Sequence, residues 1–160
     1  MLSQTTLRCL AISILLGVAI ALLSVPVRTL LADSDPWMKS QTMQPADLVK
    51  ELENPKSAPT VVFVGFKRLY TAGHIRGAQY HGTAGSAEGL QELTAWAASL
   101  PRTSNLVIYC GCCPMERCPN IRPSFKALQD LGFKNLRVLL LPTNFETDWA
   151  NQDFPYDKGN

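Results

Sequence analysis

The spacing of apolar residues along this chain changes from segment to segment: some segments have the spacing of a β-strand and others that of an α-helix. Short runs of β-branched residues alternate with stretches in which apolar residues recur at helical spacing. Strands are expected at 60–64, 106–109 and 136–141, and helices at 45–52, 86–100, 121–131 and 144–150. This alternation predicts an α/β fold in which a parallel sheet is covered by helices on both faces.

Two polar residues stand where helices are expected to begin. Ser86 precedes the apolar stripe of the helix at 86–100, and Asn120 precedes that of the helix at 121–131. Serine and asparagine are favoured N-caps because their side-chain oxygens accept hydrogen bonds from free backbone N–H groups of the first turn. Both residues are therefore predicted to be N-caps.

The first block differs from the others because its apolar run is long and has no polar face. Residues 9–27 are uncharged over a length close to that of a membrane span, and Arg8 precedes them. We expect 1–32 to be a signal peptide or an N-terminal membrane anchor, 33–42 a linker, and 43–157 the folded domain. That domain is expected to be exported, in the periplasm or held at the membrane by an uncleaved N-terminus.

Size and charge narrow the class of protein. The chain has 160 residues and 46% hydrophobic content, enough for one core. From Asp33 onward, thirteen basic residues balance thirteen acidic ones. A single globular domain is predicted, and its neutral balance argues against nucleic-acid binding through a basic face.

The chemically reactive residues gather after the strand at 106–109. Cys110 ends this strand, and Cys112, Cys113 and Cys118 follow in the loop before the next helix. In open α/β sheets ligands bind at the carboxyl ends of strands, where loop amides and a helix N-terminus favour negative charge. We therefore expect a lowered pKa at Cys110, and a thiolate nucleophile that acts on an anionic substrate.

Several segments together resemble the rhodanese (sulfurtransferase) domain. They are the motif Gly73-His74-Ile75-Arg76-Gly77-Ala78, the strand that ends in Tyr109-Cys110, the segment 131–138, and Phe145 and Trp149 ahead of Phe154-Pro155. The match runs from about residue 43 to 155 and is similar to a bacterial subgroup with a Cys-Gly-Cys-Cys-Pro loop. The resemblance implies an α/β domain in which Cys110 accepts sulfane sulfur as a persulfide, with loop amides holding the anionic donor.

Two features depart from the rhodanese pattern. Phe63-Val64-Gly65 stands where rhodaneses usually carry an Asp-Val-Arg-like element, so a charged pair that normally braces the site is missing. The loop after Cys110 is also several residues longer than usual and holds three additional thiols.

Persulfide chemistry assigns roles to the residues around Cys110. Its thiolate would attack the outer sulfur of a small anion such as thiosulfate, and a thiol or another acceptor would later remove that sulfur. Arg117 and Arg122 are expected to stabilise the thiolate and neutralise the anion. Cys112, Cys113 or Cys118 could resolve the persulfide by forming a disulfide. This chemistry needs no cofactor and no metal.

Other uses of the same thiols stay open. Four cysteines within nine positions suit Cu(I) or Zn(II), although the adjacent Cys112 and Cys113 are expected to point apart in an extended backbone. A thiol redox protein, a loop held by disulfides, and a non-catalytic rhodanese fold used for interaction are further alternatives. His74, in a glycine-rich turn, is expected to make a structural hydrogen bond rather than to act as a base.

Overall fold

A parallel five-stranded sheet forms the centre of the molecule. The computed structural model describes residues 35–159, and the strand order of the sheet is β1-β6-β5-β2-β4. Its strands are β1 (Thr42–Met43), β2 (Thr60–Phe63), β4 (Gln79–Tyr80), β5 (Asn105–Tyr109) and β6 (Asn135–Leu139). β5 pairs with β2 on one side and β6 on the other, so Cys110 follows the central strand.

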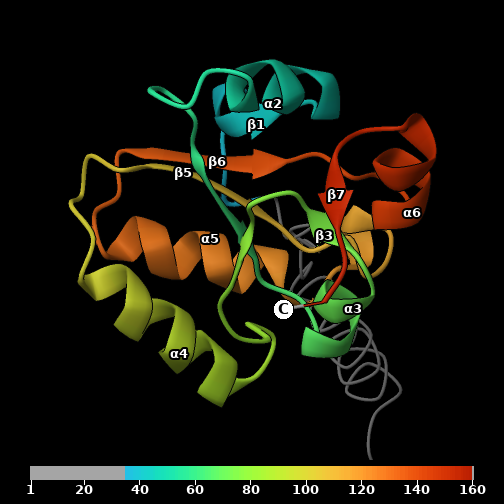
Figure 1. Ribbon diagram of the computed structural model, residues 1–160. Helices are drawn as coiled ribbons and strands as arrows, with labels where there is room; N and C mark the ends of the chain where they lie inside the picture. Colours follow the sequence, from blue (N-terminus) through green and yellow to red (C-terminus); the bar gives the residue numbers. More distant parts are fainter. Residues whose placement is uncertain (1–34, 160) are drawn as a thin grey trace, which may run out of the picture. The chain divides into compact units, whose positions relative to one another are not determined.

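Helices cover both faces of this sheet, as the sequence pattern predicts. α2 (Pro45–Leu52) lies on one face, and α4 (Ala87–Ala98) and α5 (Ile121–Asp130) lie side by side on the other (Figure 1). α3 (Lys67–Ala72) and α6 (Phe145–Asp148) lie toward the carboxyl ends of the strands (Figure 1). Ser86 caps α4 as expected, since its side-chain oxygen accepts a hydrogen bond from the N–H of Gly89. The fold is therefore α/β, with a single parallel sheet between two helical layers.

The alternation of side chains along β5 decides which way Cys110 faces. Leu106 and Ile108 pack in the core between the sheet and helices α4 and α5. Val107 and Tyr109 pack in the core on the opposite face. Because successive side chains of a strand point to opposite faces, Cys110 continues the first series and joins the α4–α5 core, where only 4% of it is exposed.

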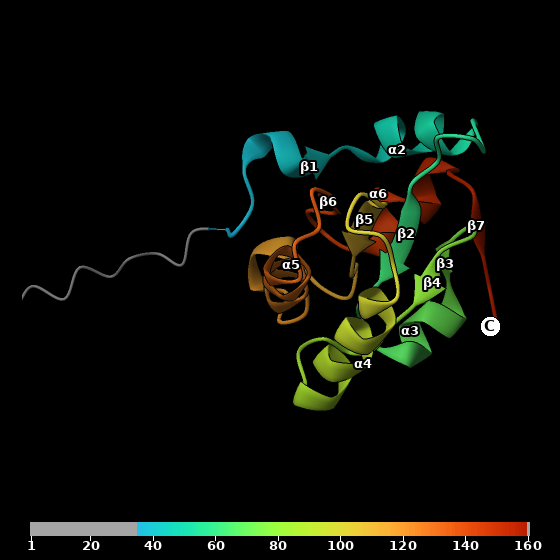
Figure 2. The same ribbon diagram turned by 90° about the vertical axis from the view of Figure 1, so that its left-hand side faces the viewer.

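The shortest elements differ from the sequence prediction. β3 (His74–Ile75) pairs antiparallel with β7 (Tyr156–Asp157) in a separate two-stranded ribbon, visible beside α3 in Figure 2. Tyr156–Asp157 therefore forms a strand and Lys67 begins a helix in segments for which the sequence pattern predicts no regular element. Two-residue strands such as β1, β3, β4 and β7 contain no hydrophobic period, so the pattern could not reveal them.

The segment predicted to be a linker, 33–42, is structured from Asp35 onward. A 3-10 helix, η1 (Lys39–Gln41), leads directly into β1. Trp37 packs edge-on against Phe125 of α5, with ring centroids 5.5 Å apart. Residues 1–32, predicted to be a signal peptide or anchor, lie outside the described residues. Within 35–159, the helices are too short or too polar to cross a bilayer.

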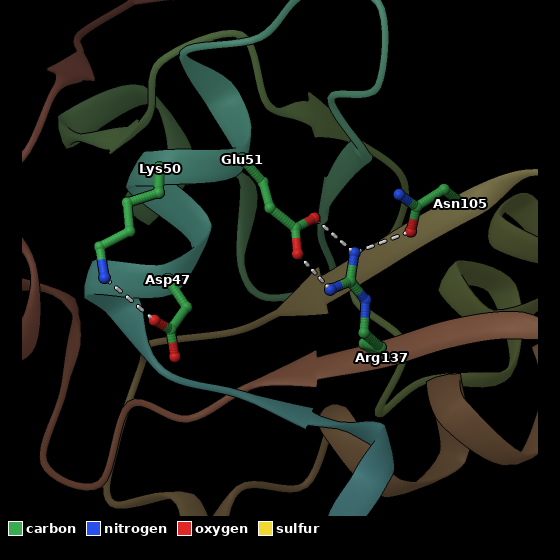
Figure 3. A network of polar contacts seen from close by, with 5 residues as sticks. All are labelled: Asp47, Lys50, Glu51, Asn105 and Arg137. Carbon is green, nitrogen blue, oxygen red and sulfur yellow. Dashed lines mark hydrogen bonds and ion pairs between the residues drawn. The ribbon is translucent and has the colours of Figure 1, made fainter.

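A polar network holds α2 against the amino ends of the central strands. Arg137 of β6 donates two hydrogen bonds of 2.7 Å to the carboxylate of Glu51 and one of 2.9 Å to Oδ1 of Asn105 (Figure 3). Bidentate pairing of this kind matches the planar guanidinium to a carboxylate. The network lies at the end of the sheet opposite to Cys110, so we assign it a structural role.

Candidate functional site

Two glycines make room for the sulfur of Cys110. Gly111 turns the chain away from β5 with a φ of 67°, in the left-handed region that favours glycine, and a Cβ there would come within 2.7 Å of Phe145. At the end of neighbouring β2, a Cβ on Gly65 would lie 2.9 Å from Cys110 Sγ. Gly65 belongs to the stretch that departs from the rhodanese pattern, and here its missing side chain is what lets Cys110 fit.

The four loop thiols converge into one cluster. The Cys110 thiol donates to Cys112 Sγ at 3.1 Å, and Cys112 Sγ lies 3.2 Å from Cys113 Sγ and 4.0 Å from Cys118 Sγ. All four are free thiols. The expectation that Cys112 and Cys113 point apart is wrong, because the loop bends at these two residues and is not extended.

Asn120 connects this cluster to the start of α5. The residue is fully buried; its Oδ1 accepts the N–H of Gly85 at 2.8 Å, and its Nδ2 donates to Cys110 Sγ at 3.3 Å and Cys112 Sγ at 3.8 Å. Asn120 occupies the predicted N-cap position, but its side chain makes no capping hydrogen bond. Sequence reasoning missed its contact with the sulfurs, because a polar residue at a helix start is already explained as a cap.

The lowered pKa belongs to a different thiol from the one expected. Hydrogen bonds from Cys110 and Cys112, together with the backbone N–H groups of Asn120 and Ile121, hold the pKa of Cys118 far below its usual range, and these outweigh the opposing effect of burial. At Cys110 the contact with Cys112 acts to lower the pKa, but the hydrogen bond to Cys118 and burial raise it overall. The predicted effect of the helix amides therefore applies to Cys118, where those amides lie.

The two arginines predicted to face the anion lie elsewhere in the loop region. Arg122 donates to the carbonyl of Met115 at 3.1 Å and pairs with the carboxylate of Asp35 at 2.6 Å. Arg122 thus connects α5 to the segment that begins at Asp35. The sequence pattern could not reveal Asp35 as its partner. Arg117 is exposed in the 3-10 helix η2 (Met115–Arg117), where its charge opposes the rise that burial causes in the pKa of Cys113. A role for Arg117 toward an incoming anion stays a prediction.

The Gly-His-Ile motif has the structural role expected for its histidine. Nδ1 of His74 donates to the carbonyl of Tyr70 at 2.8 Å, and the two rings stack with centroids 3.8 Å apart. The next residue, Ile75, donates its N–H to the hydroxyl of Tyr109 at 2.9 Å. The motif therefore supports the site by fixing the last residue of β5 before Cys110.

A pocket of about 460 Å³ opens beside Cys110 and Cys112. Its walls combine apolar side chains with one lysine, one glutamate and two asparagines, and include Phe63, Leu69, Asn144, Phe145, Glu146, Asn151, Tyr156 and Lys158. A larger hollow of about 670 Å³ lies beside Asn105 and Arg137, at the amino ends of the strands. Because parallel sheets bind ligands at the carboxyl ends of their strands, the pocket beside Cys110 is the candidate substrate pocket.

Comparison with known proteins identifies the fold. No family model and no curated protein matches this chain. Among solved structures, the rhodanese-like domain of the Alr3790 protein from Anabaena matches with a TM-score of 0.54 and 20% identity, over 74% of this chain and 79% of that one. Thiosulfate sulfurtransferase from Pseudomonas aeruginosa matches with a TM-score of 0.53 and 19% identity, over 74% of this chain and 19% of that one. A persulfide form of EanB with ergothioneine matches with a TM-score of 0.51 and 20% identity, over 73% of this chain and 28% of that one.

Proposed function

Since this chain has the rhodanese-like fold, we propose that it carries sulfane sulfur as a persulfide on Cys110 and acts in sulfur transfer. The observation that carries the proposal is the position of Cys110, at the carboxyl end of the central strand and in the wall of the 460 Å³ pocket. The side-chain amide of Asn120 supports it, because its Nδ2 is a donor 3.3 Å from Cys110 Sγ and stabilises negative charge on that sulfur.

The first half of the reaction loads the sulfur. Cys110 Sγ attacks the outer sulfur of an anionic donor such as thiosulfate; the new S–S bond forms as the bond to the sulfite group breaks, and sulfite leaves with the electron pair. The proton of Cys110 leaves with the sulfite group as hydrogensulfite, so Cys110 becomes an anionic persulfide, and the Cys112 sulfur 3.1 Å away lies within hydrogen-bond distance of the reacting thiol. Lys158 supplies the positive charge in the pocket wall that attracts the donor.

The second half of the reaction unloads it. An external thiol that enters the pocket attacks the outer sulfur and leaves as a persulfide itself, which returns Cys110 to the thiol. Alternatively, Cys112 attacks Cys110 Sγ, which forms a Cys110–Cys112 disulfide and releases hydrosulfide. This second route requires an external dithiol to reduce the disulfide before the next turnover.

Mass spectrometry on the full-length protein, reduced and free of metal, tests the loading step. After incubation with thiosulfate we expect a gain of one sulfur atom that maps to the peptide containing Cys110. The Cys110→Ser variant should show no gain, whereas Cys9→Ser, which removes the cysteine outside the loop, should gain sulfur like the wild type. If Cys110→Ser kept full sulfur-transfer activity, the proposal would be wrong.

We also propose that the domain works outside the cytoplasm. The support is the uncharged apolar run at 9–27 that follows Arg8. N-terminal sequencing of the protein recovered from a bacterial periplasm or membrane fraction distinguishes a cleaved signal from a retained anchor. Recovery of the uncleaved chain in the cytosolic fraction alone would contradict this placement.

A further inference from the structure

We propose that Cys110, Cys112 and Cys118 form a binding site for the soft monovalent ion Cu(I), a use of the cluster beyond sulfur transfer. The sulfur atoms of these three residues, which we call the thiol trio, all lie within 4.8 Å of one another. Two of the separations are 3.1 Å, from Cys110 to Cys112, and 4.0 Å, from Cys112 to Cys118.

The spacing of the trio suits a three-coordinate metal ion. Metal–thiolate bonds of roughly 2.3 Å, arranged in a plane around one ion, place neighbouring sulfur atoms about 4 Å apart. The Cys110–Cys112 separation of 3.1 Å is shorter than this value, and the Cys112–Cys118 separation of 4.0 Å matches it. Side-chain rotation alone can therefore bring the three sulfurs to bonding distance from a common centre, and the backbone of the loop need not move.

The kind of ligand favours Cu(I) over Zn(II). Within 35–159, the metal-ligating group contains three cysteines and neither histidine nor carboxylate. Thiolates select soft ions, and structural Zn(II) is almost always bound by four ligands. A set of three sulfurs matches the lower coordination number that Cu(I) accepts.

Hydrogen-bond donors around the trio stabilise the negative charge that remains on the thiolates after Cu(I) binds. Three thiolates exceed the single positive charge of Cu(I), so donors to the sulfurs stabilise the complex. Asn120 Nδ2 donates to Cys110 and Cys112, and the backbone N–H groups of Asn120 and Ile121 point at Cys118. These donors are held by the start of α5 and are in place before any ion binds.

The other side of the trio is shielded from water. A small cavity beside Cys110 and Cys118 is lined mainly by apolar side chains, those of Met115, Ile121, Leu139 and Leu141. Such surroundings protect Cu(I) from oxidation, since they keep water and oxygen ligands away from the ion. Cys112 is only half-buried, so an ion can enter from its side.

Anaerobic titration with Cu(I), in competition with a chromogenic Cu(I) chelator, tests the site in the reduced full-length protein. The Cys9→Ser background leaves the four loop cysteines as the protein's thiols. We expect one tightly bound Cu(I) per chain, and X-ray absorption at the copper edge should show three sulfur ligands. Loss of Cys112 or Cys118 to serine should weaken binding by at least about 100-fold, and loss of the Asn120 donor in Asn120→Asp by about 10-fold.

Cys113→Ser is the matched control, because it removes a thiol of the same loop that lies outside the trio. We expect it to bind Cu(I) as the parent protein does. A Cys113→Ser variant as weak as Cys118→Ser, oxygen or nitrogen ligands in the absorption spectrum, or tighter binding of Zn(II) than of Cu(I) would each overturn the proposal. The X-ray absorption spectrum of the protein with all four loop cysteines tests the ligand set even if a serine variant fails to fold.

The metal site and the sulfur carrier can fail independently. Sulfur gain by a wild-type protein that binds no Cu(I) would overturn the metal site alone, and Cu(I) binding by a wild-type protein that gains no sulfur would overturn the sulfur carrier alone. In the wild type, bound Cu(I) should prevent persulfide formation, because both use Cys110 Sγ. Persulfide formation that is unaffected by one equivalent of bound Cu(I) would place the ion elsewhere and refute the assignment of Cys110 as a ligand.

Discussion

Asn120 Nδ2 lies 3.3 Å from Cys110 Sγ, although the two residues flank different elements and the whole cysteine loop separates them. The contact joins the first residue before α5 to the first residue after β5. On its other side the same amide accepts the N–H of Gly85 at 2.8 Å, so three segments meet at one side chain. A buried amide held from both ends can keep its N–H directed at the sulfur throughout a reaction.

Replacing Asn120 by aspartate should slow sulfur transfer. Aspartate keeps an oxygen for the N–H of Gly85 but replaces the donor to Cys110 with a charged acceptor. A hydrogen bond to a charged group contributes about 1.5–3 kcal/mol, so we expect kcat to fall by about 10- to 100-fold. Steady-state kinetics with thiosulfate checks this. An unchanged kcat, or a change confined to KM, would show that the contact does not act on the reacting sulfur.

Gly65→Ala should prevent persulfide formation on Cys110, whereas Gly77→Ala should not. A Cβ at Gly65 would lie 2.9 Å from Cys110 Sγ, and overpacking of this kind destabilises a core by about 1–3 kcal/mol. Gly77 has a φ of 76° and open space around it, so alanine there costs about 1–2 kcal/mol through backbone strain alone. Denaturant unfolding should show similar losses, and mass spectrometry should show persulfide only in Gly77→Ala. Equal persulfide yields would mean that Gly65 is needed for stability alone.

Two side chains of the pocket should change the KM for thiosulfate in opposite directions. Lys158→Gln removes a positive charge and should raise KM by about two- to fivefold, as expected for an exposed ion pair worth up to about 1 kcal/mol. Glu146→Gln removes a negative charge from the same wall and should lower KM. Both effects should shrink at high salt. Lys126→Gln, on the exposed face of α5, is the control for net charge; if it matched Lys158→Gln, the effect would not come from the pocket.

The stability of the fold should depend on the Glu51–Arg137 pair at acid pH. The hydrogen bond from Arg137 lowers the pKa of Glu51 from its ordinary 4.5, against the effect of burial. Since the folded pKa is the lower one, the stabilisation is complete above pH 4.5 and is lost as the pH falls through the folded value. Because the pair is partly exposed, we expect about 0.5–1 kcal/mol. Thermal unfolding between pH 7 and 3 should show this loss in the wild type and a smaller one in Glu51→Gln.

The neighbouring Asp47–Lys50 pair provides the control for that pH series. It lies on the same helix as Glu51, its atoms are 3.6 Å apart, and both side chains are mostly exposed (Figure 3). The Asp47→Asn variant should therefore lose as much folding stability at acid pH as the wild type does. If both variants behaved alike, the general charge of α2 rather than the bidentate contact would explain the pH dependence.

The sequence by itself determined the elements whose residues repeat with a clear period. The strands β2, β5 and β6 and the helices α2, α4 and α5 lie within a few residues of their predicted positions, because backbone geometry imposes periods of 2 and 3.6 on buried side chains. The same alternation placed Cys110 at the end of a strand. A local pattern was enough for these features, since burial of one face is a property of each segment alone.

The tertiary structure decided what the loop does with its thiols. Bends at Cys112 and Cys113 bring together sulfurs that an extended backbone would separate. Hydrogen bonds from Cys110 and Cys112, together with the amides at the start of α5, lower the pKa of Cys118. Arg122 pairs with Asp35, and Asn120 donates a hydrogen bond to Cys110, because the fold brings together segments that are separated in the sequence. Loop conformations and polar partners depend on which segments the fold brings together, and the hydrophobic periodicity of the sequence carries no information about those contacts.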